Sequence, residues 1–290
     1  MTQVGWIGLG AMGRPMAARL LEAGHEVTAY DIDPGAVETL GARAKGAASA
    51  AEAATGADVL AVMVATPAQV EVVLFGDQGA APALGDGAVV LVMATVGPTA
   101  VEGLAARLAE HGVHVVDAPV SGGVARATTG DLLMMVSGPD PALAMVRPLL
   151  EAVSSKAPVV GTAPGDGQKV KLVNQLLCGV HIAAAAEGLA YAEALGLDAG
   201  ACWEVVRHGA AASFMLDDRG DRMVHGAGDE VRSALDIFVK DMGLVLAAAR
   251  GCVYPAPLAS VAEQLYLTGR RAGLGASDDS VLIEVLRGER

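Results

Sequence analysis

The sequence predicts an α/β fold: a doubly wound parallel sheet in the N-terminal half and an all-α domain in the C-terminal half. Short apolar runs alternate with helical patterns from Val4 to about Val160, as in a parallel sheet covered by helices on both faces. After Gly161 the pattern consists of long helical stretches without a convincing strand. Glycines and a proline around residues 161–165 mark the change. We therefore predict domains at residues 1–162 and 163–290, joined by one long helix.

The predicted strands are six apolar runs, at Val4–Gly8, Glu26–Tyr30, Val59–Val64, Ala88–Met93, Val113–Asp117 and Leu132–Ser137. Helical patterns between them include Pro15–Ala23 and Ala100–His111. The C-terminal half is predicted to be helical over Gly165–Leu195, Ala199–His208, Arg232–Arg250, Pro257–Arg271 and Ser280–Leu286.

Composition limits the classes of function. The 290 residues are 53% hydrophobic and carry a net charge of −13, so a folded core is expected and nucleic-acid binding is disfavoured. No spacing of the three cysteines resembles a metal site or a disulfide framework, which favours reduced thiols and a cytoplasmic protein. The start of the chain does not resemble a signal peptide, and the apolar stretch Leu172–Leu197 carries too many polar residues for a membrane span.

A glycine-rich motif follows the first predicted strand. Its residues are Gly8, Leu9, Gly10, Ala11, Met12 and Gly13, and a helix pattern begins directly after them. In a GxGxxG motif the three glycines permit a tight turn, a close approach of the pyrophosphate and tight helix–strand packing. Asp31 ends the second strand, where a carboxylate accepts hydrogen bonds from ribose hydroxyls and repels a 2′-phosphate. This order predicts a site for NAD; the alternative is a simple glycine turn with an exposed Asp31.

A second candidate, Ser121-Gly122-Gly123, follows the strand that ends at Asp117. The carboxyl ends of parallel strands are the ligand side of an open α/β sheet. One hydroxyl and two unobstructed backbone N–H groups there could hold a carboxylate. A plain loop explains the spacing equally well.

Two lysines lie within helical patterns. Lys171 shares a helix face with Asn174 and Gln175, at positions i, i+3 and i+4. A partly buried Lys171 beside a substrate hydroxyl would serve as a general acid/base, because burial lowers the pKa of an ammonium; the alternative is a snorkelling surface charge. The pair Lys240–Asp241 has the character of an ordinary surface ion pair.

Five motifs in order along the chain resemble the β-hydroxyacid dehydrogenase family, which includes 3-hydroxyisobutyrate dehydrogenase. They are GLGAMGRPMA from Gly8, DAPVSGG from Asp117, GDGQKVKLVNQ from Gly165, FVKDMGL from Phe238 and GLGASDDS from Gly273. The C-terminal half is most similar to the L-threonate dehydrogenase branch. The resemblance implies a Rossmann-type N-terminal domain, NAD as the cofactor and a small anionic hydroxy acid as the substrate.

The resemblance also implies residue roles. Lys171 would be the catalytic acid/base and Asn174 would bind the substrate and position Lys171. Ser121, Gly122 and Gly123 would hold the substrate carboxylate. The glycine motif, Asp31, Val64, Thr95 and Lys240 would contact the cofactor, with Thr95 at the nicotinamide end.

Three positions depart from the family pattern. Ala94–Thr95 replaces the usual Ser-Thr pair, Gln175 replaces a second Asn, and His is expected at position 174 in the threonate branch. We expect oxidation of L-threonate or a similar four-carbon sugar acid. The alternatives are a 3-hydroxyisobutyrate or 3-hydroxy amino acid dehydrogenase, a semialdehyde reductase, or a non-catalytic NAD-binding module.

The alanine-rich stretch GVHIAAAAEGLAYA would leave an apolar patch on a monomer, so a homodimer or homotetramer is expected. No metal site, no nucleic acid and no membrane partner is expected.

Overall fold

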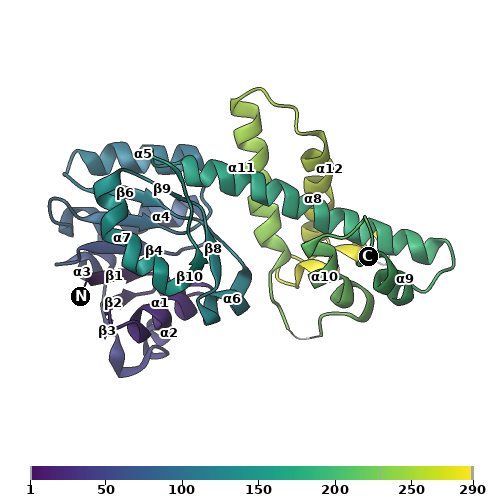
Figure 1. Cartoon of the computed structure of the whole chain (residues 1–290), viewed down its shortest axis with the longest axis horizontal. Coiled ribbons are helices and arrows are strands. Elements are labelled where there is room, and N and C mark those ends of the chain that lie inside the picture. Colours follow the sequence, from purple (N-terminus) through teal and green to yellow (C-terminus); the bar gives the residue numbers. More distant parts are fainter. Residues whose placement is uncertain (1, 229, 289–290) are drawn as a thin grey trace. The chain divides into compact units, whose positions relative to one another are not determined.

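The computed structural model describes residues 2–228 and 230–288 (Figure 1). The chain forms two compact units, one ending at Lys171 and the other beginning at Leu172. This division lies inside the long helix α8 (Asp166–Ala194). The predicted domain boundary, after residue 162, lies before α8, whereas the two compact units divide inside this helix. The first six residues of α8 belong to the first compact unit. The domain boundary therefore stays a prediction.

The first unit contains an eight-stranded sheet with the order β11-β9-β6-β5-β4-β1-β2-β3. The strands from β6 to β3 are parallel, and β9 pairs with β6 in the antiparallel direction. Their bounds are β1 Gln3–Ile7, β2 Glu26–Tyr30, β3 Lys45–Gly46, β4 Val59–Val62, β5 Val89–Val92, β6 His114–Asp117, β9 Val136–Ser137 and β11 Val159–Gly161. A second, three-stranded sheet has the order β10-β8-β7, with bounds Ser154–Lys156, Leu132–Met134 and Val120–Ser121.

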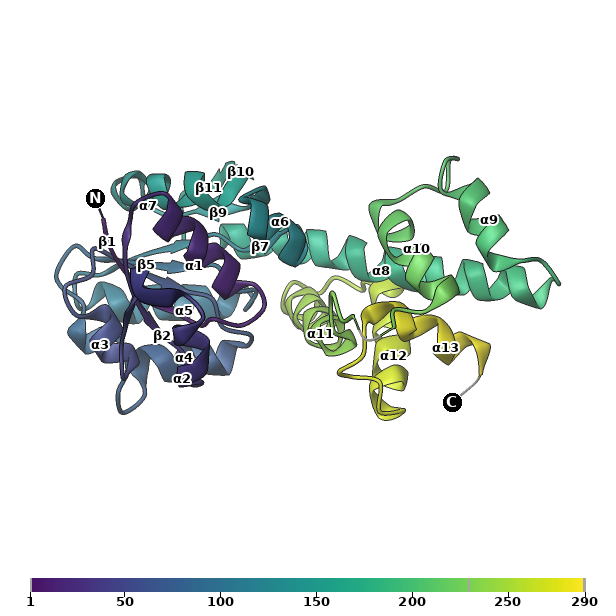
Figure 2. The ribbon, with the colours of Figure 1, turned by 90° about the horizontal axis from the view of Figure 1, so that it is seen from below.

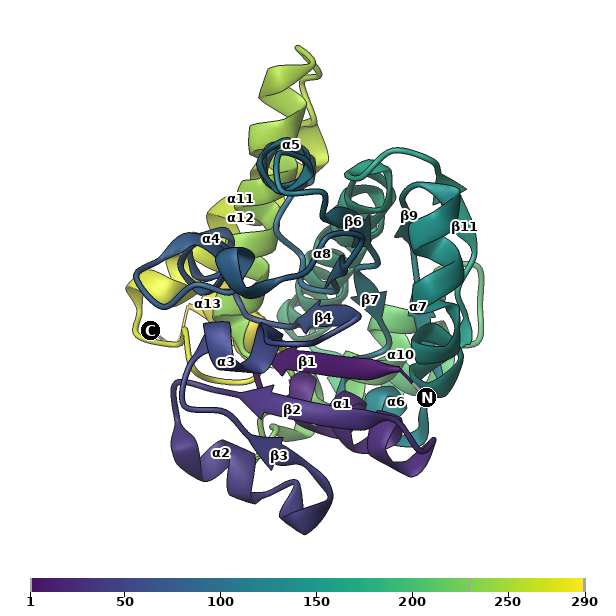
Figure 3. The same ribbon diagram turned by 90° about the vertical axis from the view of Figure 1, so that its left-hand side faces the viewer.

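Helices cover both faces of the large sheet (Figure 3). They are α1 Gly13–Glu22, α2 Pro34–Glu38, α3 Ala50–Ala54, α4 Pro67–Phe75, α5 Pro98–Ala109, α6 Gly123–Thr129 and α7 Asp140–Val153, with 3-10 turns at Gly41–Arg43 and Ala81–Ala83. Successive strand residues face opposite cores, as the two-residue repeat of a strand requires. In β4, for example, Val59 and Ala61 pack in the core with α1 and α7, whereas Leu60 and Val62 pack in the core with α3, α4 and α5. The apolar runs are therefore continuous because both faces are buried.

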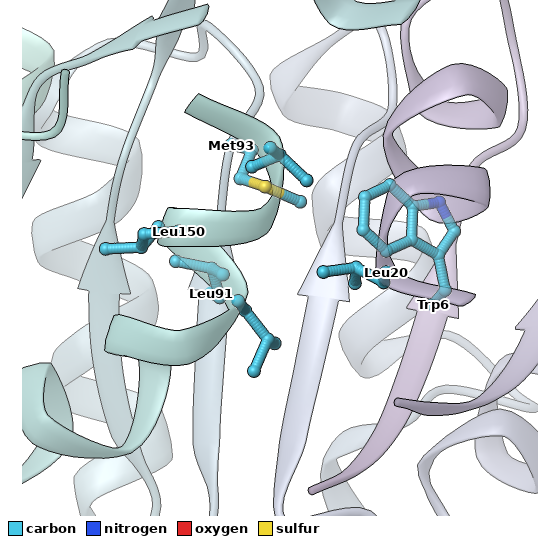
Figure 4. Close-up of a pocket in the computed structure, with 7 residues that line it drawn as sticks. Trp6, Leu20, Leu91, Met93 and Leu150 are labelled. Carbon is cyan, nitrogen blue, oxygen red and sulfur yellow. The ribbon is translucent and has the colours of Figure 1, made fainter. Parts of the chain in front are cut away.

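The core on the α1 and α7 side is closely packed. Trp6, Leu20, Leu91, Met93 and Leu150 surround a space too small for a water molecule (Figure 4). The Trp6 indole N–H is the one polar group of this set, and it donates to the carbonyl oxygen of Gly8 across 2.8 Å. The sheet core thus also fixes the first residue of the glycine-rich loop.

The second unit is helical in its described residues. After α8 follow α9 Ala199–Val206, α10 Phe214–His225, α11 Leu235–Gly251, α12 Pro257–Arg271, the 3-10 turn Asp279–Val281 and α13 Leu282–Arg287. In Figure 2, α9 and α10 lie on one side of α8, and α11 and α12 lie on the other. The fully buried Tyr266 of α12 stacks on Phe238 of α11 and donates to the carbonyl oxygen of Gly179 in α8, across 2.9 Å.

A buried charge cluster ties α10 to the segment before α13. Arg222 contacts Asp278 across 3.0 Å, and Arg219 contacts Asp279 across 2.9 Å. Burial would raise the pKa of Asp278, but hydrogen bonds from Ser280 and Arg222 outweigh it and hold that pKa below its ordinary value. The GASDDS motif therefore has a structural role in this unit.

The predicted fold class is confirmed, and the differences are local. The run Leu132–Ser137 is not one strand, because it divides into β8 and β9, which belong to different sheets. Helix α10 and strands β3, β7, β10 and β11 were not predicted. Asp33 caps α2 by accepting from Gly35, as expected of a turn residue before a proline. By length and hydropathy alone α8 would qualify as a membrane span, a criterion that core helices of globular proteins also meet.

Candidate active site

The predicted cofactor residues other than Lys240, which is on α11, lie at one edge of the large sheet. The motif from Gly8 follows β1, Asp31 follows β2, Val64 follows β4 and Thr95 follows β5. These four strands are parallel, so their carboxyl ends share an edge. The chain order reverses between β1 and β4, and this is the switch point where open α/β sheets bind ligands.

The glycines of the loop have three different environments. Gly8 has a φ of 97°, and a side chain there would collide with the carbonyl oxygen of Met63 and approach Val64. A side chain at Gly13 would collide with the Gly8 carbonyl oxygen. A methyl group at Gly10, by contrast, would meet no other atom within 4 Å. Gly8 and Gly13 therefore fix the turn, and Gly10 leaves open backbone at the start of α1, as the pyrophosphate of a dinucleotide requires.

Asp31 is connected directly to this loop. Its Oδ2 accepts from the backbone N–H of Leu9 across 2.6 Å, and its Oδ1 accepts from the N–H of Asp33 across 2.9 Å. The carboxylate is thereby held beside the loop. Each carboxylate oxygen has two acceptor positions, so a ribose hydroxyl can still be bound.

Asp117, at the end of β6, anchors the first turn of α8. Its carboxylate accepts from the backbone N–H groups of Gly165 and Gln168, each across 2.8 Å, and from the Ser137 hydroxyl. Burial raises the pKa of this carboxyl above its ordinary value, although the three hydrogen bonds lower it. The anchor determines where the helix that carries Lys171 begins.

Gln168 is a site residue that sequence reasoning missed. Its side chain is fully buried, and its Oε1 accepts from the N–H groups of Val96 and Gly97, each across 3.0 Å. Its Nε2 donates to the carbonyl oxygen of Ala94 across 3.0 Å. Gln168 thus holds the turn that carries Thr95, and it lies one helical turn before Lys171. The first turn of α8 also carries Asp166 and Lys169, so no signal in the sequence singled out Gln168.

The Ser121-Gly122-Gly123 stretch forms the link between β7 and α6. Gly122 has a φ of 139° and Gly123 a φ of 71°, conformations that favour glycine. Ser121 and Gly122 are half-buried and Gly123 is exposed. A loop of this shape presents a hydroxyl and backbone N–H groups near the carboxyl end of β6.

Lys171 is 5% exposed, so it is not a surface lysine. It lies on α8 one turn before the half-buried Asn174. Burying an ammonium costs free energy, and an ionisable group buried near a ligand edge is a candidate for proton transfer.

Lys240 and Asp241 are not the ordinary surface pair that the pattern suggested. Asp241 is 2% exposed and lies 2.9 Å from the Lys240 ammonium. Asp241 also accepts from Gln175 Nε2, and Gln175 Oε1 accepts from Asn174 Nδ2 across 2.8 Å. Lys240 and Asn174 are therefore connected in the helical unit through one ion pair and two hydrogen bonds.

Sequence comparison identifies the class of protein. A family model described as the NAD binding domain of 6-phosphogluconate dehydrogenase matches residues 3–161. A second, described as NAD-binding of NADP-dependent 3-hydroxyisobutyrate dehydrogenase, matches residues 165–286. The chain belongs to the β-hydroxyacid dehydrogenase family, which includes the 3-hydroxyisobutyrate dehydrogenases.

Individual relatives refine this assignment. L-threonate dehydrogenase of Cupriavidus necator is 44% identical over 287 residues, which cover 98% of this chain and 96% of the relative. The structure of 3-hydroxyisobutyrate dehydrogenase from Salmonella typhimurium is 40% identical, has a TM-score of 0.89 and covers 97% of this chain and 99% of its own. A Mycobacterium tuberculosis 3-hydroxyisobutyrate dehydrogenase with L-serine is 31% identical, with a TM-score of 0.88 and 99% coverage of both chains.

Fold, glycine loop and relatives together define an NAD-dependent oxidoreductase that acts on a CH–OH group of a small hydroxy acid. The open backbone at Gly10 fits the predicted cofactor.

Proposed function

We propose that the protein oxidises L-threonate or a similar four-carbon sugar acid, with Lys171 as the general acid/base. The buried position of Lys171, at the start of a helix anchored to the ligand edge of the sheet, carries the proposal. The L-threonate dehydrogenase of Cupriavidus necator, at 44% identity, supports the substrate.

In the proposed reaction the substrate carboxylate binds the Ser121 hydroxyl and the N–H groups of Gly122 and Gly123. Lys171 Nζ takes the proton of the reacting hydroxyl as the carbon loses hydride, and the C–O bond becomes a carbonyl. NAD+, when bound, accepts the hydride. In reduction Lys171 returns the proton to the carbonyl oxygen. Asn174 binds the hydroxyl side of the substrate.

Cofactor contacts follow the sheet edge. Gly10 and the start of α1 would hold the pyrophosphate, Asp31 would accept from the adenosine ribose, and Val64 and Thr95 would contact the cofactor. Lys240 is proposed to reach it from the helical unit. Because Asp31 is already fixed by Leu9, it presents a negative charge where NADP carries its 2′-phosphate. This favours NAD.

The alternatives differ in their substrates. L-serine in the Mycobacterium tuberculosis structure favours a 3-hydroxy amino acid as the second candidate. A non-catalytic NAD-binding module is disfavoured, because the relatives that match nearly the whole chain are named as dehydrogenases. A cytoplasmic location stays a prediction.

The test is NAD+ reduction, followed by NADH absorbance, with L-threonate, D-threonate, 3-hydroxyisobutyrate, glycerate, serine and threonine, and with NADP+ in parallel. Preference for L-threonate with NAD+ supports the proposal. If only 3-hydroxyisobutyrate or serine is turned over, the proposed substrate is wrong, but the proposed proton and hydride transfer stands. NADH binding without turnover in either direction would support the binding module.

A further inference from the structure

A chain of hydrogen bonds in the helical unit runs from Asp241 to Asn174. Gln175 Nε2 donates to Asp241 Oδ2, and Asn174 Nδ2 donates to Gln175 Oε1 across 2.8 Å. Asp241 and Gln175 are 2% and 6% exposed. Bulk water therefore does not compete for the bond between Gln175 and Asp241, whereas Asn174, at the end of the chain of bonds, is half-buried.

The charge at Asp241 fixes the direction of the chain. A carboxylate paired with an ammonium, here Lys240 at 2.9 Å, only accepts hydrogen bonds. Gln175 must therefore turn its nitrogen toward Asp241 and its oxygen toward Asn174. Asn174 in turn must face Gln175 with its nitrogen. The orientation of both amides follows from one carboxylate.

The orientation determines what Asn174 offers to a ligand. Its Nδ2 donates to Gln175 and also lies 3.5 Å from Cys178 Sγ. Both N–H groups are thus directed at protein atoms, and the amide presents its carbonyl oxygen. This oxygen binds a donor, such as a hydroxyl, and is unfavourable beside a carboxylate or carbonyl oxygen.

We propose that Asp241 is a positioning residue that acts through Gln175, so that Asn174 Oδ1 accepts from a second hydroxyl of the substrate. The inference rests on the proposed function and narrows its substrates to acids that carry a hydrogen-bond donor, such as a second hydroxyl, beside the reacting hydroxyl. The reacting hydroxyl has one proton, which Lys171 removes. Asn174 needs a different donor, and a neighbouring hydroxyl supplies it.

The test compares kcat/KM for L-threonate with kcat/KM for 2-hydroxybutyrate and 3-hydroxybutyrate, which keep the four-carbon skeleton but carry one hydroxyl. The wild type is expected to prefer L-threonate. Gln175→Met keeps the bulk and removes the amide, so this preference should fall about tenfold, the value of one hydrogen bond. Asp241→Asn lets the Gln175 amide turn around and should lower the preference similarly.

The double variant Gln175→Glu with Asp241→Asn is the rescue. The amide at position 241 then donates to a carboxylate at position 175, which still accepts from Asn174, so the preference should return. A recovered preference for L-threonate in the double variant cannot be explained by a general loss of stability in the single variants. Far-UV circular dichroism and melting temperature verify that each variant is folded.

Equal slowing of all three acids in both single variants, with the preference unchanged, would overturn the inference. An equal slowing of all three acids with a shifted pH profile of kcat would also overturn the inference, because Asn174 would then position Lys171 and not bind the substrate. A wild type that prefers the monohydroxy acids also overturns it and leaves the dehydrogenase intact. Absence of turnover with every hydroxy acid would instead overturn the proposed function.

Discussion

Gln168 is the partner of three buried backbone groups, at Ala94, Val96 and Gly97. Gln168→Met fills the same space but leaves all three unpaired, and each such group costs about 1–3 kcal/mol. We expect the unfolding free energy to fall by at least about 3 kcal/mol and kcat to fall as the Thr95 turn loosens. Denaturant unfolding and steady-state kinetics measure both effects.

The matched control is Gln264→Met, at an exposed position of α12. It should change the unfolding free energy by no more than about 0.5 kcal/mol. Similar stability for Gln168→Met and this control would show that Gln168 does not hold the turn.

For single residues, the sequence predicted where a side chain lies in the fold better than it predicted its hydrogen-bond partners. Strand ends locate Gly8, Asp31, Val64 and Thr95, because parallel strands present their carboxyl ends together. Gln168 and Asp241 lay outside that reasoning, since a polar residue in a helix is normally exposed. Gln168 is buried at the carboxyl edge of the sheet, and Asp241 is buried against α8. Only the tertiary structure supplies these neighbours.

At the level of elements, substitutions in the glycine loop are expected to have separate effects on folding and on cofactor binding. Gly10→Ala meets open space, so the unfolding free energy should stay within about 1 kcal/mol of the wild type while NAD affinity falls. Gly13→Ala places a methyl group against the Gly8 carbonyl oxygen and should lower stability itself, by about 1–3 kcal/mol. Thermal melting with and without NADH distinguishes them; unchanged NADH affinity in Gly10→Ala would contradict the assignment.

The link between α10 and the segment before α13 should depend on pH. The pKa of Asp278 lies below its ordinary value of 3.8, so its contribution to stability is present above that pH and is lost as the pH falls through the folded value. Asp278→Asn removes one of the two carboxylates that Arg222 contacts, the other being Asp218 at 3.3 Å, and should lower the unfolding free energy by about 1–3 kcal/mol at neutral pH. The difference from the wild type should narrow in acid; a constant difference across pH would contradict this account.

The bounds of an element were predictable from the sequence where one helical pattern extended over many residues. Helix α12 has the predicted bounds, and α8 differs by only one residue at each end. The run Leu132–Ser137 was misinterpreted as one strand because an apolar run does not reveal which sheet it enters. Met135 donates to Pro119 at the point of division, a contact with a residue sixteen positions earlier.

At the scale of the whole molecule, α8 exposes a stripe that is apolar apart from His181: Val173, Leu177, His181, Ala184, Gly188 and Tyr191, continued by Leu195 directly after the helix. Leu177, Tyr191 and Leu195 are 48%, 63% and 58% exposed. Such a stripe on a long helix fits the expected homodimer or homotetramer. Leu177→Glu with Tyr191→Glu should shift the mass toward the monomer in light scattering, whereas Val72→Glu on α4 should not. A monomeric wild type at micromolar concentration would contradict the prediction.

The central claim is proton transfer by Lys171 in an NAD-dependent dehydrogenase. The most direct measurement is kcat of Lys171→Ala with NAD+ and the best hydroxy acid of the panel, together with the dissociation constant for NADH. Loss of a general acid/base predicts a fall in kcat of about 10²–10⁴-fold with NADH binding nearly unchanged. Turnover close to that of the wild type would show that another group moves the proton and would refute the assignment.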